Sequence, residues 1–264
     1  MPKIHRAIQA VFFGFDGTLT KLTRSRAELA EEGAQRMTRW LTERGIALPP
    51  DFVTQWLAAR RFAEQKSRQE GEEHTADNTL AFLLKLHGHG SPPAEVIEGA
   101  VDAFFSAEAS HRVLFEDALP ALHSLRNEGY FVGIIANSSC DRAIRREIDR
   151  LGLRRYIDLV VTSAAVEARM PRQEIYQRAL DQMDVLGHEA VMVSAKAVPD
   201  LEGAREAQMW TIHISREEAI TAASHTAPDS TARALIEAVS VIKEWAMTWG
   251  WRYAEGEDDV PFAT

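Results

Sequence analysis

Three side chains that can do chemistry follow apolar runs of this chain: the carboxyl of Asp16, the amide of Asn137 and the ammonium of Lys196. Such runs are typical of buried strands, and the ends of parallel strands meet at one edge of a sheet. We therefore expect the three side chains to lie close together. A carboxylate can take a proton from the amine of a bound substrate, so Asp16 is a candidate general base. Ser138 and Ser139, at the start of a predicted helix, would help to hold a bound anion.

The elements that would position these side chains alternate along the chain. Apolar runs predict strands at residues 8–13, 131–136, 159–162, 190–193 and 210–214. Helical patterns predict helices at residues 117–127, 141–151, 173–183, 200–208 and 230–249. Strands that alternate with helices indicate an α/β fold with a Rossmann-like parallel sheet covered on both faces.

Residues 21–111 interrupt this alternation with a pattern that is almost wholly helical. Apolar side chains recur at helical spacing over residues 29–41, and further helices fit residues 52–65, 77–86 and 93–107. Two prolines at 49–50 and a Gly-rich stretch at 88–93 separate these helices. We interpret the block 21–111 as an inserted helical cap, and residues 1–20 and 112–264 as the α/β core.

After the first predicted strand the chain reads Gly14-Phe15-Asp16-Gly17-Thr18-Leu19. This stretch resembles the first motif of the haloacid dehalogenase-like (HAD) superfamily, Asp-x-Asp-Gly-Thr-Leu. The resemblance implies the HAD fold, a nucleophile at the first Asp and a general acid/base at the second. Here the nucleophile is replaced by Gly14, which has no side chain, and Asp16 matches the acid/base. A second interpretation stays open, in which Asp16 is kept because Asp-Gly makes a good turn.

The other three strand-end motifs of the superfamily have counterparts in the right order. The resemblance implies a phosphoryl-binding hydroxyl where Ala136 stands, followed by the retained Asn137, which either contacts a ligand or ties its loop together. It implies a lysine where Met170 stands and a metal-binding Asp where Ala195 follows Ser194, which replaces a Gly. Four functional groups are therefore absent together, which indicates a repurposed site.

The resemblance also implies a Mg²⁺ site made by the first-motif Asp, a backbone carbonyl and the fourth-motif Asp. Asp16 and Asp200 are the acids that remain, so we predict no tight Mg²⁺ site, no metal ligands and no cofactor. Without a carboxylate in reach of phosphorus we predict no phosphatase activity through an aspartyl intermediate. We also expect a roomier and less polar pocket at Gly14, Ala136 and Ala195, with Met170 as an apolar wall.

Two functions from different classes remain. The first is a metal-independent enzyme whose substrate carries its own amine, which displaces a neighbouring sulfate or phosphate while Asp16 takes the proton. The chain resembles, in this respect, the HAD-like proteins implicated in aziridine formation in natural-product pathways. The expected substrate-binding residues are Phe15, Asn137, Ser138, Ser139, Met170, Lys196 and Asp200.

The second function is that of a catalytically inactive protein that binds a ligand or stabilises a catalytic partner. Trp245, Trp249 and Trp251 would form the partner surface, or they pack the last predicted helix onto the core. A protein partner or an oligomer therefore stays open beside the small-molecule ligand. The charged stretches 70–74 and 142–146 are interpreted as solvated, and the acidic tail 254–260 as mobile.

Composition excludes other partners. The formal net charge is −9, so we expect no nucleic acid. Cys140 is the single cysteine, which excludes an internal disulfide and indicates a reducing cytoplasm. We see no signal peptide and no transmembrane segment, and expect no membrane partner.

Overall fold

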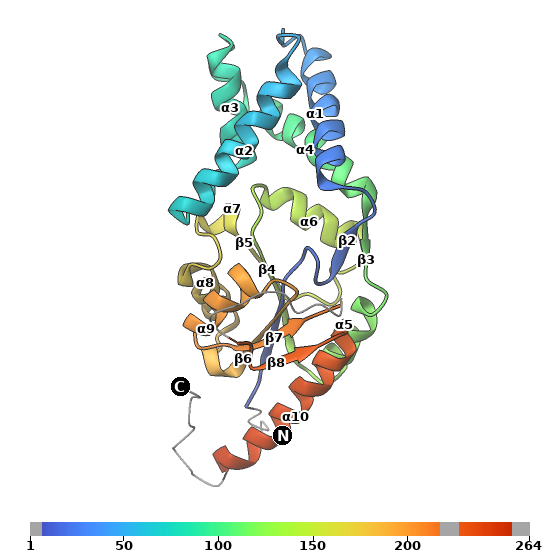
Figure 1. The fold of residues 1–264 in the computed structure, drawn as a ribbon, viewed down its shortest axis with the longest axis vertical. Coiled ribbons are helices and arrows are strands. Elements are labelled where there is room, and N and C mark those ends of the chain that lie inside the picture. The colour runs from blue at the N-terminus through green and yellow to red at the C-terminus, as the bar shows by residue number, and fades with distance from the viewer. Residues whose placement is uncertain (1–6, 217–226, 255–264) are drawn as a thin grey trace.

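A six-stranded parallel sheet forms the centre of the core (Figure 1). The computed structural model describes residues 7–216 and 227–254, with side chains up to residue 247. The strand order is β5–β4–β1–β6–β7–β8. The strands are β1 (Ala10–Phe13), β4 (Phe131–Ala136), β5 (Leu159–Thr162), β6 (Ala190–Ser194), β7 (Trp210–Ile214) and β8 (Ser230–Ala232). The predicted α/β class with a parallel sheet is confirmed.

Both faces of the sheet are covered because successive strand residues point to opposite sides. Val11 and Phe13 of β1 face one apolar cluster, while Ala10 and Phe12 face another. The first cluster includes side chains of α5 (Ala118–Asn127), α6 (Asp141–Arg150) and α10 (Leu235–Ala254). The second includes those of α8 (Gln173–Met183) and α9 (Glu202–Glu206). Near-continuous apolar runs such as residues 131–136 are what a sheet buried on both faces requires.

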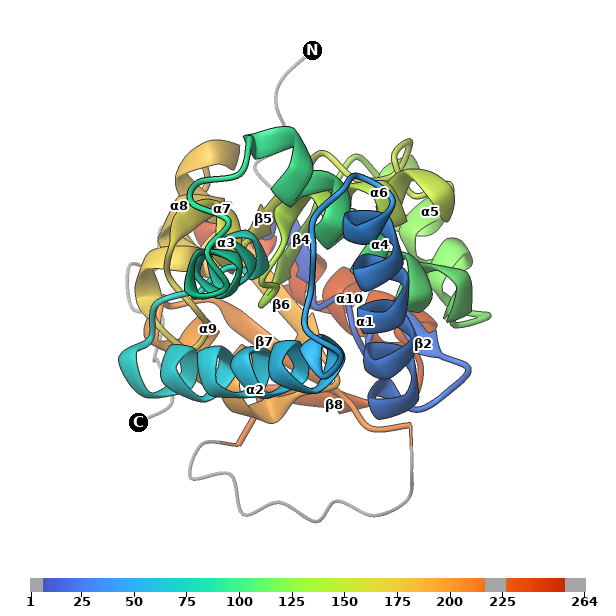
Figure 2. The same ribbon diagram turned by 90° about the horizontal axis from the view of Figure 1, so that it is seen from above.

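Four helices between β1 and β4 gather at one end of the sheet, above its strand ends (Figures 1 and 2). They are α1 (Arg26–Thr42), α2 (Phe52–Glu70), α3 (Ala76–Leu86) and α4 (Ala94–His111), and we call residues 26–111 the cap. Two short antiparallel strands, β2 (Thr20–Leu22) and β3 (Arg112–Leu114), connect the cap to the core.

The cap has its own apolar centre, in which Trp56 and Phe104 meet edge to face with ring centroids 5.3 Å apart. Local signals start its helices. Ser25 makes a capping box with Glu28 at the start of α1, and Thr75 caps α3 through the backbone N–H of Asn78.

The C-terminal part of the core differs from the expectation. The helix predicted from residue 230 begins only at Leu235, because residues 230–232 pair with β7 as β8. Asp117, the first residue of the helix predicted at 117–127, stands at the N-cap of α5 but makes no side-chain capping bond to it. Its carboxylate instead accepts from the backbone N–H of Leu235 (2.7 Å) and pairs with Arg216 (3.0 Å), so it caps α10. The strands β2 and β3 and the short helix α7 (Ser163–Val166) were not predicted.

The predicted tryptophan surface is only partly within the described residues. Trp245 packs against Trp210 with ring centroids 5.4 Å apart, as expected of a helix docked on the core. The side chains of Trp249 and Trp251, and the acidic tail from residue 255, lie outside what the structure describes. Across the described residues, the helices are too short or too polar to cross a membrane.

Candidate active site

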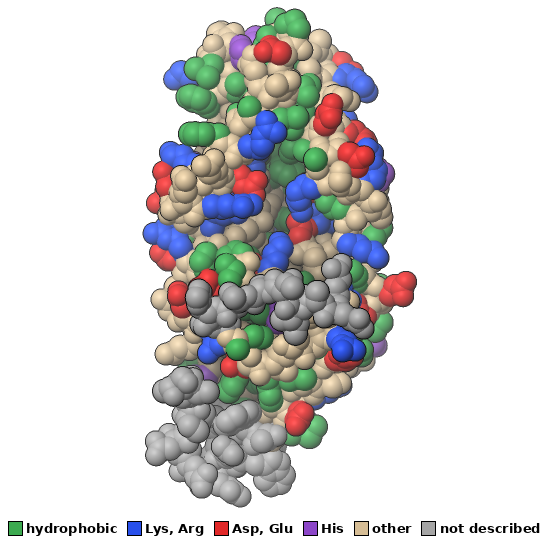
Figure 3. Space-filling view, viewed as in Figure 1, with side chains coloured by type: hydrophobic (Ala, Val, Ile, Leu, Met, Phe, Trp, Pro, Cys, Tyr) green, Lys and Arg blue, Asp and Glu red, His purple; other side chains and the backbone are tan. Residues whose placement is uncertain are grey.

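The ends of β1, β4 and β6 converge beneath the cap and bring most of the predicted residues together. They line a cavity of about 20 Å³, hardly more than one water molecule needs. The lining consists of Phe15, Asp16, Ile135, Ala136, Asn137, Ile144, Met170, Lys196 and Asp200. Ser138 and Ser139 do not line it. On the face drawn in Figure 3, Lys and Arg side chains gather around a hollow between cap and core, although the chain carries a net charge of −9.

The expectation of a roomier pocket is wrong, because the space beside Gly14 is filled. A Cβ at Gly14 would lie 2.8 Å from the hydroxyl of Ser194, 2.9 Å from that of Thr18 and 3.1 Å from a carboxylate oxygen of Asp200. The first two distances are shorter than real side chains tolerate. The hydroxyl at Ser194, where the superfamily motif has a Gly, thus crowds the space that a Cβ at position 14 would need.

Asp200 belongs to this filling and is not free to bind a ligand. Its side chain is buried and accepts from the hydroxyl of Ser194 (2.6 Å), while its backbone carbonyl accepts from the hydroxyl of Tyr176 (2.6 Å). Burial raises the pKa of Asp200, although Lys196 and the Ser194 hydrogen bond oppose this effect. The hydroxyl of Thr18, which also lies beside Gly14, accepts from the backbone N–H of Ala195 (3.0 Å).

Asp16 is held by two arginines that come from the two ends of the cap. Its Oδ2 accepts from Arg26 at the start of α1 (2.8 Å), and its Oδ1 accepts from Arg112 at the start of β3. Burial alone would raise the pKa of Asp16, but Arg112, Arg26 and Lys196 together lower it. The carboxylate is therefore ionised at neutral pH and is a weaker base than a free aspartate.

Neither arginine was found from the sequence, although both stand at the boundaries of the predicted cap. Arg112 is only 4% exposed and also pairs with Glu108 (2.8 Å) and Glu147 (3.6 Å). Arg26 is 59% exposed and pairs with Glu108 as well (3.2 Å). A cation at each end of an insertion is a weak signal, since arginines are common on helices, and only the fold brings these two to Asp16.

Three of the expected ligand donors serve the loops instead. The amide of Asn137 donates to the carbonyl of Met170 (3.0 Å) and accepts from its N–H (2.9 Å). The backbone N–H of Ser138 donates to the hydroxyl of Ser163 (2.9 Å). The hydroxyl of Ser139 accepts from Arg60 of the cap (2.5 Å). Of the two interpretations of Asn137, this geometry favours the one in which it ties the loop together.

Of the remaining candidates, two are apolar side chains that wall the cavity and one is a cation. Phe15 and Met170 are buried and pack into the two apolar clusters of the core. Lys196 is exposed, and within the described ranges it forms no ion pair. Its ammonium is the cation of this site that no neighbouring carboxylate balances directly, so it is the best anchor for an anion here.

The donors present do not fit the Mg²⁺ that the superfamily resemblance implies. Mg²⁺ requires several oxygen ligands in near-octahedral geometry. Both oxygens of Asp16 are taken by arginines, and Asp200 is buried against Ser194. No group of three potential metal ligands occurs within residues 7–216 and 227–254.

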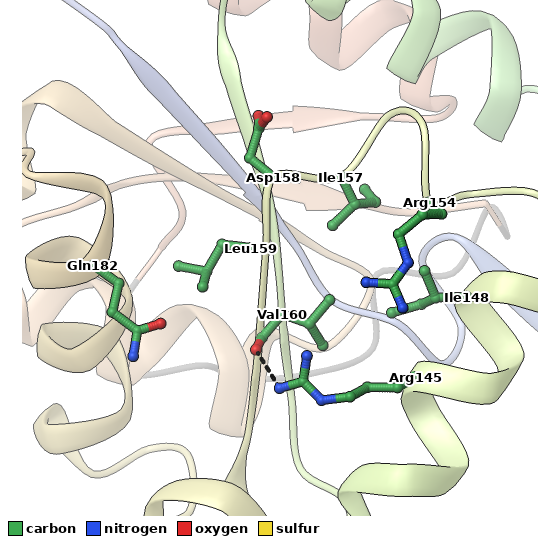
Figure 4. A pocket seen from close by; sticks show the side chains of 8 residues that line it. All are labelled: Arg145, Ile148, Arg154, Ile157, Asp158, Leu159, Val160 and Gln182. Atoms are coloured by element: carbon green, nitrogen blue, oxygen red, sulfur yellow. Dashed lines mark hydrogen bonds between the residues drawn. The ribbon is translucent and has the colours of Figure 1, made fainter.

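A larger hollow of about 200 Å³ lies at the free edge of β5, between α6 and α8 (Figure 4). Its two cations are already balanced. Arg145 pairs with Asp141 (2.7 Å) and donates to the carbonyl of Val160 (3.3 Å), and Arg154 pairs with Asp149 (2.7 Å). It contains none of the predicted site residues.

Comparison with known proteins agrees with the order of the four motifs. The family model of the haloacid dehalogenase-like hydrolases matches residues 8–208. A glyceraldehyde 3-phosphate phosphatase of Methanopyrus kandleri is 28% identical over 209 residues, which cover 79% of this chain and 84% of the relative. A ribulose-1,5-bisphosphate 5-phosphatase of Halopiger xanaduensis is 27% identical over 161 residues, or 61% and 66% of the two chains.

Solved structures show the same fold. A 2-haloacid dehalogenase from Pseudomonas syringae has a TM-score of 0.67 at 19% identity and covers 90% of this chain and 99% of its own. A HAD phosphatase from Thermococcus onnurineus has a TM-score of 0.56 at 22% identity and covers 89% and 98%.

The filling beside Gly14 predicts a coupled pair of substitutions. Gly14→Ala adds the Cβ that meets the Ser194 hydroxyl, so it should lower the free energy of unfolding by about 1–3 kcal/mol. In a Ser194→Gly background the same change should cost less than half as much. Urea unfolding of the four proteins measures this coupling, and equal costs in both backgrounds would contradict it.

The ion pairs of Asp16 predict a pH dependence of stability. A carboxyl whose pKa is lowered by folding stabilises the protein above its unfolded pKa of about 3.9, and this stabilisation is lost as the pH falls through the lowered value. The free energy of unfolding of wild type should therefore be about 1–3 kcal/mol higher than that of Asp16→Asn at pH 7, and this difference should disappear below pH of about 4. Urea unfolding between pH 3 and pH 7 tests this, and a difference independent of pH would refute it.

Proposed function

Because this chain belongs to the haloacid dehalogenase-like hydrolase family, we propose that it keeps the family's fold without its phosphohydrolase chemistry. We propose that it is a metal-independent enzyme of specialised metabolism. Its substrate would be a small molecule in which an amine displaces a neighbouring sulfate or phosphate intramolecularly, as in aziridine formation. The lone cysteine suits the cytoplasm as its location.

The filled space beside Gly14 carries this proposal. The relatives are named as phosphatases, and a phosphatase of this family needs a carboxylate at that position. Here the Ser194 hydroxyl lies 2.8 Å from where a Cβ at position 14 would be, so other side chains fill the space that the carboxylate would need. A substrate with its own nucleophile needs neither that carboxylate nor the lysine replaced by Met170.

The displacement balances without a metal. The lone pair of the substrate's amine forms the new carbon–nitrogen bond, the carbon–oxygen bond breaks, and the sulfate or phosphate leaves with its electron pair. Lys196 would hold the departing anion, and the proton of the amine would pass to Asp16 or to water. Because both oxygens of Asp16 accept from arginines and its pKa is lowered, it would orient the developing ammonium only after Arg26 releases Oδ2.

The second candidate is a catalytically inactive protein that binds a ligand or stabilises a partner subunit. This candidate is supported by the lack of free space and of free carboxylate oxygens at the site. Both oxygens of Asp16 are held by arginines, and the cavity of about 20 Å³ has room for hardly more than one water molecule. A partner subunit that completes the site would reconcile the two candidates.

Loss of the phosphohydrolase chemistry predicts no Mg²⁺-dependent phosphatase activity. The purified protein is incubated with Mg²⁺ at about 5 mM. It should release phosphate from glyceraldehyde 3-phosphate or an aryl phosphate no faster than a sample without protein. Calorimetry should detect no Mg²⁺ binding at micromolar affinity. Phosphate release at ordinary phosphatase rates, about 1–10³ per second, would refute the proposal.

The displacement chemistry is tested with a vicinal amino-sulfate ester. Sulfate release and the cyclised amine should appear in equal amounts, and Lys196→Met should lower the rate by roughly tenfold or more. Lys85→Met, on an exposed position of the cap, is the matched control and should leave the rate unchanged. If wild type forms neither product, the enzyme proposal fails and the second candidate gains.

A further inference from the structure

The strand-end motifs of this chain bind the cap where the family's motifs serve a ligand. The first motif does so through Asp16, whose two oxygens are held by Arg26 and Arg112. These arginines stand where the chain enters and leaves the cap. The carboxylate therefore joins both ends of the cap to the end of β1.

The third motif binds the cap through Arg169, the residue just before Met170. Its guanidinium pairs with Glu73 in the loop between α2 and α3 (2.6 Å), and the hydroxyl of Ser163 donates to the same carboxylate (2.7 Å). The two charged side chains are only 12% and 2% exposed. The positive charge of this motif thus lies one residue before the position of the family's lysine, and it pairs with the cap.

Backbone bonds reinforce this contact. The N–H of Arg169 donates to the carbonyl of Gly71 (2.9 Å), and that of Glu73 donates to the carbonyl of Glu167 (3.3 Å). The loop 70–74, interpreted from the sequence as solvated, therefore adds a short stretch of bridge-like pairing to the core.

The second motif contributes polar and apolar contacts. The hydroxyl of Ser139 accepts from Arg60, and its carbonyl accepts from the N–H of Ala76 (2.9 Å). The next residue, Cys140, is buried in the apolar cluster of the cap together with Ala76 and Leu80. The cap and the core share one apolar cluster at this point, so separating them would expose it to water.

The helix α6 adds a third side to the attachment. Arg142 pairs with Asp77 of α3 (2.7 Å), and Arg146 pairs with Asp102 of α4 (2.6 Å). The stretch 142–146 was interpreted from the sequence as a solvated face, but these two arginines reach the cap.

We propose that the cap is fastened shut by these motifs in the resting protein, and that the buried pair of Glu73 and Arg169 is the main fastening. The contacts lie on several sides of the strand ends, so the cap cannot swing about β2 and β3 without breaking them together. Opening would break these contacts together and expose the shared apolar cluster around Cys140 to water, which makes the open state rare. This inference does not depend on which reaction, if any, the site performs.

Cys140 provides the measurement, because it is the single cysteine of the chain and lies under the cap. Burial raises the pKa of its thiol to about 11, so a thiol reagent should react only when the cap opens. We expect slow labelling of the wild type by a disulfide reagent at pH 7.5. Glu73→Gln keeps the shape of the side chain but leaves Arg169 unpaired, and should accelerate labelling by at least tenfold.

Arg68→Gln is the matched control, because it breaks a pair with Glu64 within α2 whose side chains are 70% and 49% exposed, and it should leave the rate within twofold of wild type. Labelling is repeated in low urea to separate cap opening from global unfolding, since local opening exposes less surface and depends less on urea. The proposal is overturned if Glu73→Gln labels at the wild-type rate, or if its acceleration follows global unfolding alone.

Discussion

The ion pairs of Asp16 with Arg26 and Arg112 connect everything that is distinctive about this molecule. One carboxylate at the end of the central strand is shared by the two points where the chain enters and leaves the cap. Arg112 is almost fully buried, and a buried guanidinium needs carboxylates around it. Asp16, Glu108 and Glu147 meet this need together. The residue that resembles a catalytic acid/base therefore also balances charge at the hinge of the cap.

The packing beside Gly14 leaves no empty space at the position where the superfamily motif has an Asp. Protein interiors do not tolerate voids well, and a deleted side chain normally leaves a destabilising cavity. Here the hydroxyls of Ser194 and Thr18 and the carboxylate of Asp200 occupy that volume. The small residue at position 14 packs against the hydroxyl at position 194, a contact that the first motif alone does not reveal.

The ion pairs of Asp16 and the packing beside Gly14 together leave few polar groups at the strand ends free to bind a ligand. Their polar groups are satisfied by one another or by the cap, as the bonds of Asn137, Ser139 and Asp200 show. What is left for a ligand is the ammonium of Lys196, which forms no ion pair within the described residues. A site of this kind can attract an anion, but it must rearrange before it can enclose one.

The sequence by itself determined the α/β fold, and it predicted the strand ends that line the small cavity. Periodic apolar runs and the order of four motifs are local signals, and strands such as residues 131–136 were predicted to the residue. The short strands β2, β3 and β8 were missed because three residues carry too little pattern.

Only the tertiary structure decided what the site residues do. Asp16 meets Arg112 across 96 residues, and Glu73 meets Arg169 across the same separation. No local pattern encodes contacts at that distance. Nor did the small side chains at Gly14 and Ala195 indicate free space, because the volume at a position is set by neighbours from other strands. The physical reason is the same in both cases: charge pairing and close packing depend on which residues the fold brings together.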